Sequence, residues 1–265
     1  MFLPRAIWAC LLYPSACCSL LLLAARARAE DGPQCPYEEP QSLTASIYSQ
    51  DSDPPQLLFK FRRTSSRSGS AVRVLREYWY PDGRLAAREH VLYDSGGLKS
   101  YELEALQTSS VGRVTAGQSP AEPGRTQLSF EYNKDLARTS HARIAHESLS
   151  SSPLVNDMIG FFICEHFDKL NHGLKVNCRY IVVSRKETVG LSFTKEGETT
   201  YHGKPVILLK LQPTSPLISV LVDPLHFTVE KEPPHRVLQY VGRTTPKINE
   251  GGHWKDLDAV TVFEW

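Results

Sequence analysis

The sequence predicts a mainly β protein with one long helix (α+β), in which an antiparallel half-barrel or barrel wraps the helix or is covered by it. Three observations lead to this prediction. Runs of β-forming residues recur along most of the chain, clusters of Gly, Pro, Asp and Ser separate them, and the segment near 152–170 has helical periodicity instead. Short antiparallel strands of this kind form barrels, half-barrels or sandwiches. We expect a single β-rich domain over residues 42–265, with the helix between two sets of strands.

Alternating apolar and polar residues define most of the expected strands. Val189, Leu191 and Phe193 alternate with polar neighbours, which indicates a sheet with one face toward water. Segments 205–211 and 217–222 are apolar on both sides and are expected to be central strands. The other expected strands are 57–61, 72–80, 128–131, 178–183, 225–229, 237–241 and 259–263, with polar loops at 62–70 and 117–124 and turns at 81–83 and 95–97.

The helical segment carries apolar residues on two sides. Ser151 or Ser152 can cap it, Pro153 suits its first turn, and Gly173 follows its end. One broad face holds Val155, Ile159, Phe162, Ile163, His166, Phe167 and Leu170, and a second cluster holds Leu154, Met158 and Phe161. A helix with two apolar sides cannot lie on one sheet with water behind it. It is either sandwiched within the protein or covers an apolar ligand.

The first 29 residues predict a secretory signal peptide. Arg5 precedes an apolar run from Ala6 to Ala25, and Ala27-Arg28-Ala29 places small residues at the −3 and −1 positions of a cleavage site near Ala29. We therefore expect a periplasmic or otherwise exported protein, with a loose N-terminal segment at 30–41. A retained anchor and a lipidated Cys17 are alternatives, and Pro14 disfavours both because it interrupts the apolar run and stands where an aliphatic residue is wanted.

Composition excludes some classes of partner and of scaffold. Loss of residues 1–29 leaves 27 basic against 29 acidic side chains, a formal charge of −2. This balance disfavours nucleic acid, which requires a basic surface. Only Cys35, Cys164 and Cys178 remain, so the chain is neither a disulfide-dense scaffold nor a zinc finger. A Cys164–Cys178 disulfide would close a short loop, and three reduced thiols are the alternative.

The sequence contains no complete catalytic or cofactor motif, and we predict a protein that is not an enzyme and has no cofactor. Ser192 and Lys195 have the S-x-x-K spacing, but in a strand these positions point to opposite faces. His166 lies on the apolar helix face without metal-ligand spacing around it. Asp256 and Asp258 would share a strand face and could hold a calcium ion, although a solvated turn is the simpler interpretation.

Two resemblances to known families follow from these patterns. The segments Tyr80-Pro81-Asp82-Gly83-Arg84-Leu85 and Tyr93-Asp94-Ser95-Gly96-Gly97-Leu98-Lys99-Ser100-Tyr101 resemble the hairpins of MORN-type repeats. The layout of residues 70–265 is similar to periplasmic half-barrels of the lipoprotein-carrier type (LolA/LolB-like) and to uncharacterised exported proteins of that shape. The second resemblance implies a curved antiparallel sheet around a helix, with a cavity between them that takes acyl chains.

These observations lead to one functional hypothesis and two alternatives. We expect a periplasmic binding or carrier protein for an acyl chain or lipid, which Leu154, Met158, Phe161 and Phe162 would contact between sheet and helix. The rationale is the gain of about 0.8 kcal/mol for each CH₂ group that leaves water. Alternatively, the helix is packed core in a structural or interaction module of the cell envelope, with an envelope protein as partner. An outer-membrane β-barrel, suggested by the terminal Trp265, or a hydrolase is the third hypothesis.

Overall fold

A computed structural model describes residues 40–94, 97–137, 141–220 and 222–265, and these form one antiparallel sheet of 14 strands. The strand order is β8-β7-β6-β5-β4-β3-β2-β1-β14-β13-β12-β11-β10-β9, so the sheet is open, with β8 and β9 at its edges. The strands are β1 Ser42–Ser49, β2 Leu57–Ser68, β3 Ala71–Trp79, β4 Leu85–Asp94, β5 Gly97–Ala105, β6 Ser110–Gln118, β7 Thr126–Asn133, β8 Arg143–Leu149, β9 Val176–Val182, β10 Glu187–Tyr201, β11 Lys204–Pro213, β12 Leu225–Glu230, β13 Val237–Glu250 and β14 His253–Glu264.

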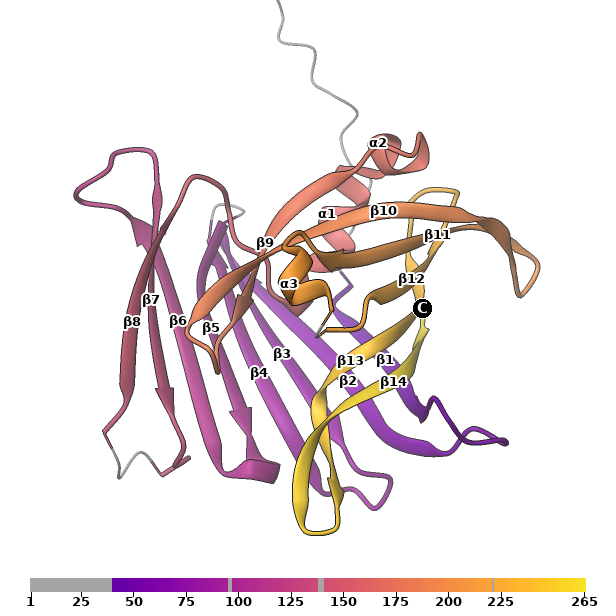
Figure 1. The fold of residues 1–265 in the computed structure, drawn as a ribbon, viewed down its shortest axis with the longest axis horizontal. Helices are drawn as coiled ribbons and strands as arrows, with labels where there is room; N and C mark the ends of the chain where they lie inside the picture. Colours follow the sequence, from indigo (N-terminus) through magenta and orange to yellow (C-terminus); the bar gives the residue numbers. More distant parts are fainter. Residues whose placement is uncertain (1–39, 95–96, 138–140, 221) are drawn as a thin grey trace, which may run out of the picture. The chain divides into compact units, whose positions relative to one another are not determined.

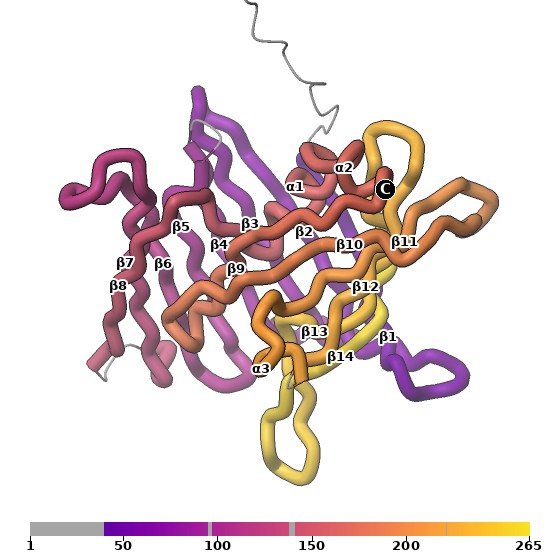
Figure 2. The backbone as a smooth tube through the Cα atoms, turned by 45° about the horizontal axis from the view of Figure 1, so that its top comes forward, coloured from indigo at the N-terminus to yellow at the C-terminus, as the bar shows by residue number. Residues whose placement is uncertain are grey.

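The sheet consists of two meanders that meet through the first and last strands. Strands β1 to β8 follow one another in space, as do β9 to β14, and β1 pairs with β14 through partners such as Ile47 and Thr261. Figures 1 and 2 show the two halves curving toward each other as an open half-barrel. The predicted antiparallel half-barrel is therefore confirmed as an architecture.

Side-chain alternation gives the sheet one apolar concave face. On β2, for example, Phe59, Phe61 and Arg63 are buried while Lys60 and Arg62 are exposed. Three buried clusters cover this face, one over β3 to β7, one under the helices, and one around β1, β2 and β14. The core therefore lies inside the curve of the sheet, on the side that the helices occupy.

The prediction of one long helix over residues 152–170 is wrong. Leu154 is extended and forms a parallel bridge with Tyr180 of β9, and it is followed by a one-turn 3₁₀ helix η2 (Asn156–Met158), α1 (Ile159–Glu165) and α2 (Phe167–Asn171). Because Leu154 accepts and donates backbone hydrogen bonds at the edge of β9, the residues around Pro153 cannot be helical. His166, with φ −108° and ψ 12°, then separates α1 from α2.

Two other local predictions are also wrong. The polar loop expected at 62–70 is mostly strand, because β2 continues to Ser68, with Arg62 exposed and Arg63 buried. The strand expected at 217–222 does not form, since Pro216–Ser219 are the short helix α3. Leu217 and Val220 are exposed there, which shows that a continuous apolar run does not by itself specify a buried strand.

Both MORN-like segments lie at hairpins of the sheet. The first contains the β3–β4 turn, in which Tyr80 and Arg84 pair through their backbones, and the second contains the β4–β5 connection. The predicted signal peptide, its cleavage site and most of segment 30–41 lie outside the described residues. Among the residues that are described, no helix is long and apolar enough to cross a membrane.

The two edges of the open sheet are joined by side chains. Glu147 of β8 accepts hydrogen bonds from the Thr188 backbone N–H (2.7 Å) and hydroxyl (2.6 Å) of β10 and from Arg179 Nη2 of β9 (2.8 Å). Gly112 of β6 lies close to Val183, so that an added Cβ would stand 2.6 Å from its methyl group. These side-chain contacts form a seam between the two edges of the sheet. The described residues of β8 and β9 do not pair with each other through backbone hydrogen bonds.

Candidate binding cavity

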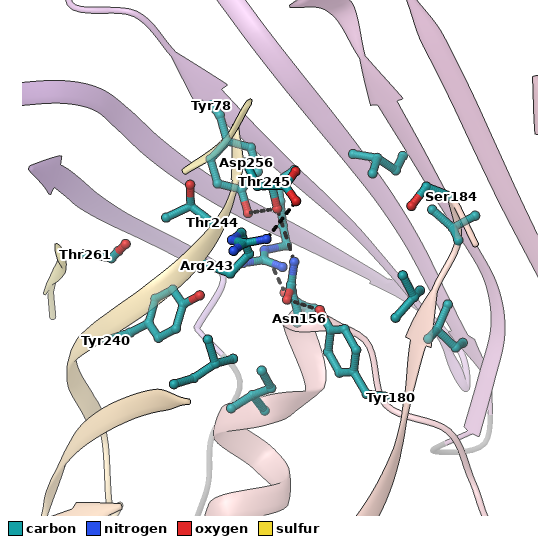
Figure 3. A pocket seen from close by; sticks show the side chains of 18 of the residues that line it. Tyr78, Asn156, Tyr180, Ser184, Tyr240, Arg243, Thr244, Thr245, Asp256 and Thr261 are labelled. Atoms are coloured by element: carbon teal, nitrogen blue, oxygen red, sulfur yellow. Dashed lines mark hydrogen bonds and ion pairs between the residues drawn. The ribbon is translucent and has the colours of Figure 1, made fainter. Parts of the chain in front are cut away.

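A cavity of about 1010 Å³ lies inside the curve of the sheet. Its walls come from alternate residues of strands in both meanders and from the segment between Asn156 and Gly160. Apolar positions such as Leu191, Leu211 and Phe227 line it. Residues of β13 and β14, among them Tyr240, Arg243 and Thr261, also line it (Figure 3). The cavity is thus a product of the strand register, since each strand contributes only the side chains that point inward.

Tyrosines are prominent on the wall, and two of their hydroxyls are held by protein partners. The five are Tyr78, Tyr101, Tyr132, Tyr180 and Tyr240. The Tyr180 hydroxyl donates to Asn156 Oδ1, and the Tyr78 hydroxyl lies 3.2 Å from Thr245 Oγ1 and donates to Glu89 Oε1 at 3.3 Å. These bonds connect β3, β9 and β13 across the interior (Figure 3).

Burial keeps these phenols neutral. Loss of solvation is the largest cause that raises the pKa of Tyr78, Tyr101, Tyr180 and Tyr240 above the ordinary value. The Glu89 carboxylate adds to the rise in pKa at Tyr101 and Tyr180, because a phenolate beside it would be repelled. At neutral pH the tyrosine hydroxyls therefore remain hydrogen-bond donors.

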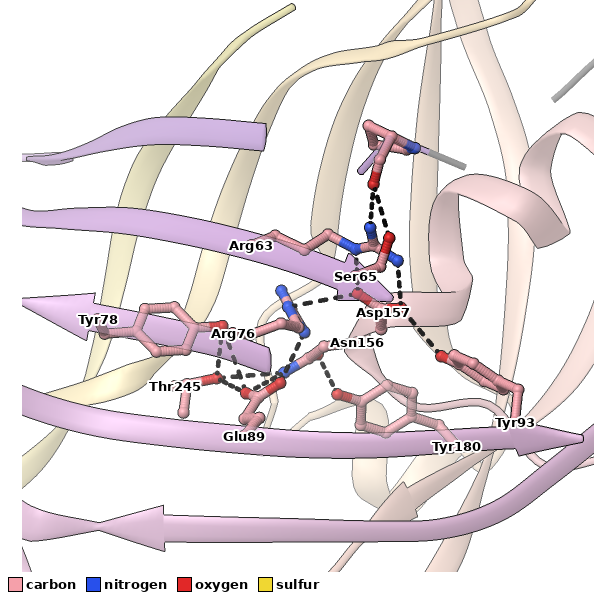
Figure 4. A network of polar contacts seen from close by, with 11 residues as sticks. Arg63, Ser65, Arg76, Tyr78, Glu89, Tyr93, Asn156, Asp157, Tyr180 and Thr245 are labelled. Atoms are coloured by element: carbon pink, nitrogen blue, oxygen red, sulfur yellow. Dashed lines mark hydrogen bonds and ion pairs between the residues drawn. The ribbon is translucent and has the colours of Figure 1, made fainter. Parts of the chain in front are cut away.

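A buried ion pair lies beside the tyrosines (Figure 4). Glu89 has no exposed surface and accepts from Arg76 Nη1 (2.7 Å), Thr245 Oγ1 (2.5 Å) and Asn156 Nδ2 (3.2 Å). Burial alone would lower the pKa of Arg76, but the Glu89 carboxylate, with Tyr78 and Asp157, raises it above its ordinary value. The Arg76 guanidinium therefore stays charged inside the protein.

A second buried pair fixes η2 to the sheet. Arg63 binds Asp157 through both ends of its guanidinium, with Nε–Oδ1 at 2.7 Å and Nη2–Oδ2 at 3.0 Å. Its Nη1 donates to the Pro40 carbonyl at 2.5 Å, and the Tyr93 hydroxyl donates to Asp157 at 3.1 Å (Figure 4). Asn156 and Asp157 thus attach the segment before α1 to β2, β3, β4 and β13.

Residues on β13 and β14 form a third set of ion pairs at the cavity. Arg243 contacts Asp258 at 2.9 Å and Asp256 at 2.7 Å, and Lys247 also pairs with Asp256. Burial would raise the pKa of Asp256, but Lys247 and Arg243 outweigh it and hold that pKa below its usual range. Asp256 and Asp258 do share a strand face as expected. Their charges are matched by basic side chains, and no cluster suited to a metal ion occurs among the described residues.

The structure places the four residues predicted to contact a ligand away from the cavity wall. Leu154 is buried beside β9, Met158 packs against the cluster over β3 to β7, Phe162 stacks on His166 at 4.3 Å between ring centroids, and Phe161 is 44% exposed. In the same segment, Asn156, Asp157, Ile159 and Gly160 line the cavity instead. The difference follows from the break in the helix, which turns other side chains inward.

The predicted Cys164–Cys178 disulfide is wrong. Cys178 is a free thiol that packs against the apolar cluster under the helices, while Cys164 of α1 forms a disulfide with another cysteine. Burial raises the pKa of the Cys178 thiol to about 12. The S-x-x-K pair is also separated, since Ser192 is buried and Lys195 Nζ contacts Asn171.

No protein-family model matches the sequence, and no curated protein matches it. The structure is similar to the crystal structure of the β-barrel-like protein of the domain of unknown function DUF1849 from Brucella abortus. The two share 7% identity over 84% of this chain and 95% of that chain, with a TM-score of 0.38. The fold of this chain is an open antiparallel half-barrel, and its specific likeness to lipoprotein carriers stays a prediction.

Proposed function

We propose that this protein is a binding or carrier module that holds a hydrophobic or amphipathic small molecule, such as a lipid, in the cavity of the half-barrel and carries out no catalysis. The observation that carries the proposal is the cavity of about 1010 Å³. Ligand sites in proteins typically measure about 300–1,000 Å³ and combine apolar walls with a few polar groups. The mixture of Leu, Phe, Tyr and buried ion pairs on this wall fits that description.

The size of the cavity also bears on the alternative of a packed scaffold. The cavity is partly open to solvent, so it is a space that the fold keeps accessible and not a sealed void within the packed core. A protein whose helix merely filled its core would close such a space, as α1 and α2 do at Phe193 and Leu209. A cavity retained beside that packed region favours binding.

Lipid capture fits the predicted export of the chain, which is part of the proposal. A ligand with an acyl chain would gain about 0.8 kcal/mol for each CH₂ group transferred from water to the apolar wall. The polar side chains of the cavity wall would orient the polar end of the ligand. An envelope protein could receive or supply the ligand.

A substitution that fills the cavity tests this function. Thr261 of β14 is 5% exposed and lines the cavity, and Thr199 of β10 is exposed and lies away from it. We expect Thr261→Phe to reduce binding of a fluorescent fatty-acid probe at least tenfold, because the ring occupies ligand space. Thr199→Phe, with the same change of side chain, should bind the probe like the unmodified protein.

Circular dichroism and urea unfolding would confirm that both variants remain folded. The proposal fails if the unmodified protein binds neither the probe nor lipid extracted from membranes, or if folded Thr261→Phe binds as tightly as Thr199→Phe. Either result would favour the packed module of the cell envelope.

A further inference from the structure

Two side chains on the cavity wall are buried and yet offer hydroxyl groups without a protein partner. Tyr101 of β5 and Thr261 of β14 are each 5% exposed, both line the cavity, and neither hydroxyl forms a hydrogen bond with any described residue. Tyr240 of β13 also lines the cavity, and its hydroxyl likewise has no partner among the residues that the structure describes; its ring points inward (Figure 3). These hydroxyls face the partly open cavity, where they can bond to water or to a ligand that carries acceptor groups.

These groups differ from two other tyrosines of the wall. Tyr78 and Tyr180 have their hydroxyls engaged by Thr245 and Asn156. The rise in pKa at Tyr101 and Tyr240, caused mainly by burial, means that these phenols are protonated at any physiological pH. They therefore present donors, and the complementary ligand carries acceptor oxygens.

The buried charges on the wall are already balanced. Each buried guanidinium has a carboxylate partner, Arg63 with Asp157 and Arg76 with Glu89, and Arg243 is paired with Asp256 and Asp258. The remaining basic residues on the wall are the β13 residue Lys247, which pairs with Asp256, and the exposed Lys134 and Arg185. An anionic headgroup placed in the interior would lose its hydration without gaining a free counter-ion.

We propose that the cavity selects a neutral lipid with carbonyl oxygens, such as an acylglycerol ester, and that Tyr101, Tyr240 and Thr261 donate hydrogen bonds to those oxygens. The inference rests on the proposed function and narrows it from any hydrophobic ligand to one class. The acyl chain would lie along apolar residues of the wall such as Leu191, Leu211 and Phe227.

Titrations with two matched probes, each below its micellar concentration, test the selection. Monolauroylglycerol and laurate have the same chain, and they differ in carrying a neutral ester or a carboxylate. At pH 8 we expect the ester to bind at least tenfold more tightly than the anion, as measured by calorimetry. Tyr101→Phe and Tyr240→Phe should each weaken ester binding by about 2- to 12-fold, the effect of one hydrogen bond.

Tyr201→Phe is the matched control, since Tyr201 of β10 lies away from the cavity wall. The Tyr201→Phe protein should bind the ester with the affinity of the unmodified protein. The inference is overturned if laurate binds as tightly as the ester, or if the two cavity variants bind the ester like Tyr201→Phe. Either result would overturn only the selection for a neutral ester and would leave the proposed binding function intact. If neither probe nor membrane lipid binds to any of the proteins, the proposed function itself fails, and the two failures are thereby distinguished.

Discussion

The Arg76–Glu89 pair supports a quantitative prediction about how the interior is held together. Glu89 is completely buried and accepts hydrogen bonds from Arg76, Thr245 and Asn156, which belong to β3, β13 and η2. Glu89→Gln keeps the shape of the side chain and removes its charge. The Arg76 guanidinium would then have Asp157 as its one nearby carboxylate among the described residues. Asp157 Oδ1 lies 3.8 Å from Arg76 Nε and already binds Arg63.

The expected loss follows from the burial of the charge left behind. Removing one partner of a buried ion pair costs about 3–5 kcal/mol, because the other charge stays desolvated without compensation. Replacing both partners leaves no such charge, so Arg76→Met combined with Glu89→Gln should be more stable than Glu89→Gln alone. The exposed pair of Lys255 with Glu250 provides the control, and Glu250→Gln should lose less than about 1 kcal/mol.

Urea unfolding at pH 7, followed by tryptophan fluorescence and far-ultraviolet circular dichroism, measures these differences. Equal m-values across the variants would show that the unfolded states are comparable. The reasoning is refuted if Glu89→Gln loses less than 1 kcal/mol, or if the double variant is less stable than Glu89→Gln.

Three further predictions concern the seam, the free thiol and the edge of the sheet. Gly112→Ala should lower the free energy of unfolding in urea by about 1–3 kcal/mol, because its Cβ would collide with Val183. Gly117 on the same strand has open space around it, so Gly117→Ala should lower it much less. Equal losses for the two variants would contradict the seam contact. The Cys178 thiol, with a pKa of about 12, should resist iodoacetamide in the native protein at pH 8 and react after unfolding, as followed by peptide mass spectrometry. Folding raises the pKa of this thiol, so the thiol should add to the free energy of unfolding at pH values below its unfolded pKa of about 8.5. This contribution should be lost as the pH rises from there toward 12, and Cys178→Ala should abolish that pH dependence. Glu147→Ala removes three hydrogen bonds to β9 and β10 and should lose about 1–3 kcal/mol and accelerate amide hydrogen exchange at both edges; unchanged exchange would mean that the seam contributes nothing.

Local pattern was sufficient to predict most strands. The alternation at Leu225, Phe227 and Val229 predicts a strand with one buried face. The strand β12 forms there, but Thr228 and Glu230 of its other face are buried as well. Pattern failed where tertiary contacts decide the conformation. Leu154 is extended because it pairs with Tyr180, and no property of residues near Pro153 reveals that partner.

The cavity could not be derived from the sequence for a related reason. Tyr101 and Tyr240 lie far apart in the chain, on β5 and β13, and line the same cavity only because the sheet curves and its register points both side chains inward. The same holds for Glu89 and Thr245, whose hydrogen bond joins the two meanders. A sequence shows which residues face inward on a strand, and it does not show which strands lie side by side across a barrel.

The most direct test of the central claim is native mass spectrometry of the protein purified without detergent from the cells that produce it. The account predicts a folded protein that carries an additional mass of several hundred daltons, released on activation and identified as a neutral lipid, and a Thr261→Phe protein that lacks it. A folded protein that shows only its own mass, and that acquires no lipid when mixed with membrane extract, would contradict a binding function for the cavity.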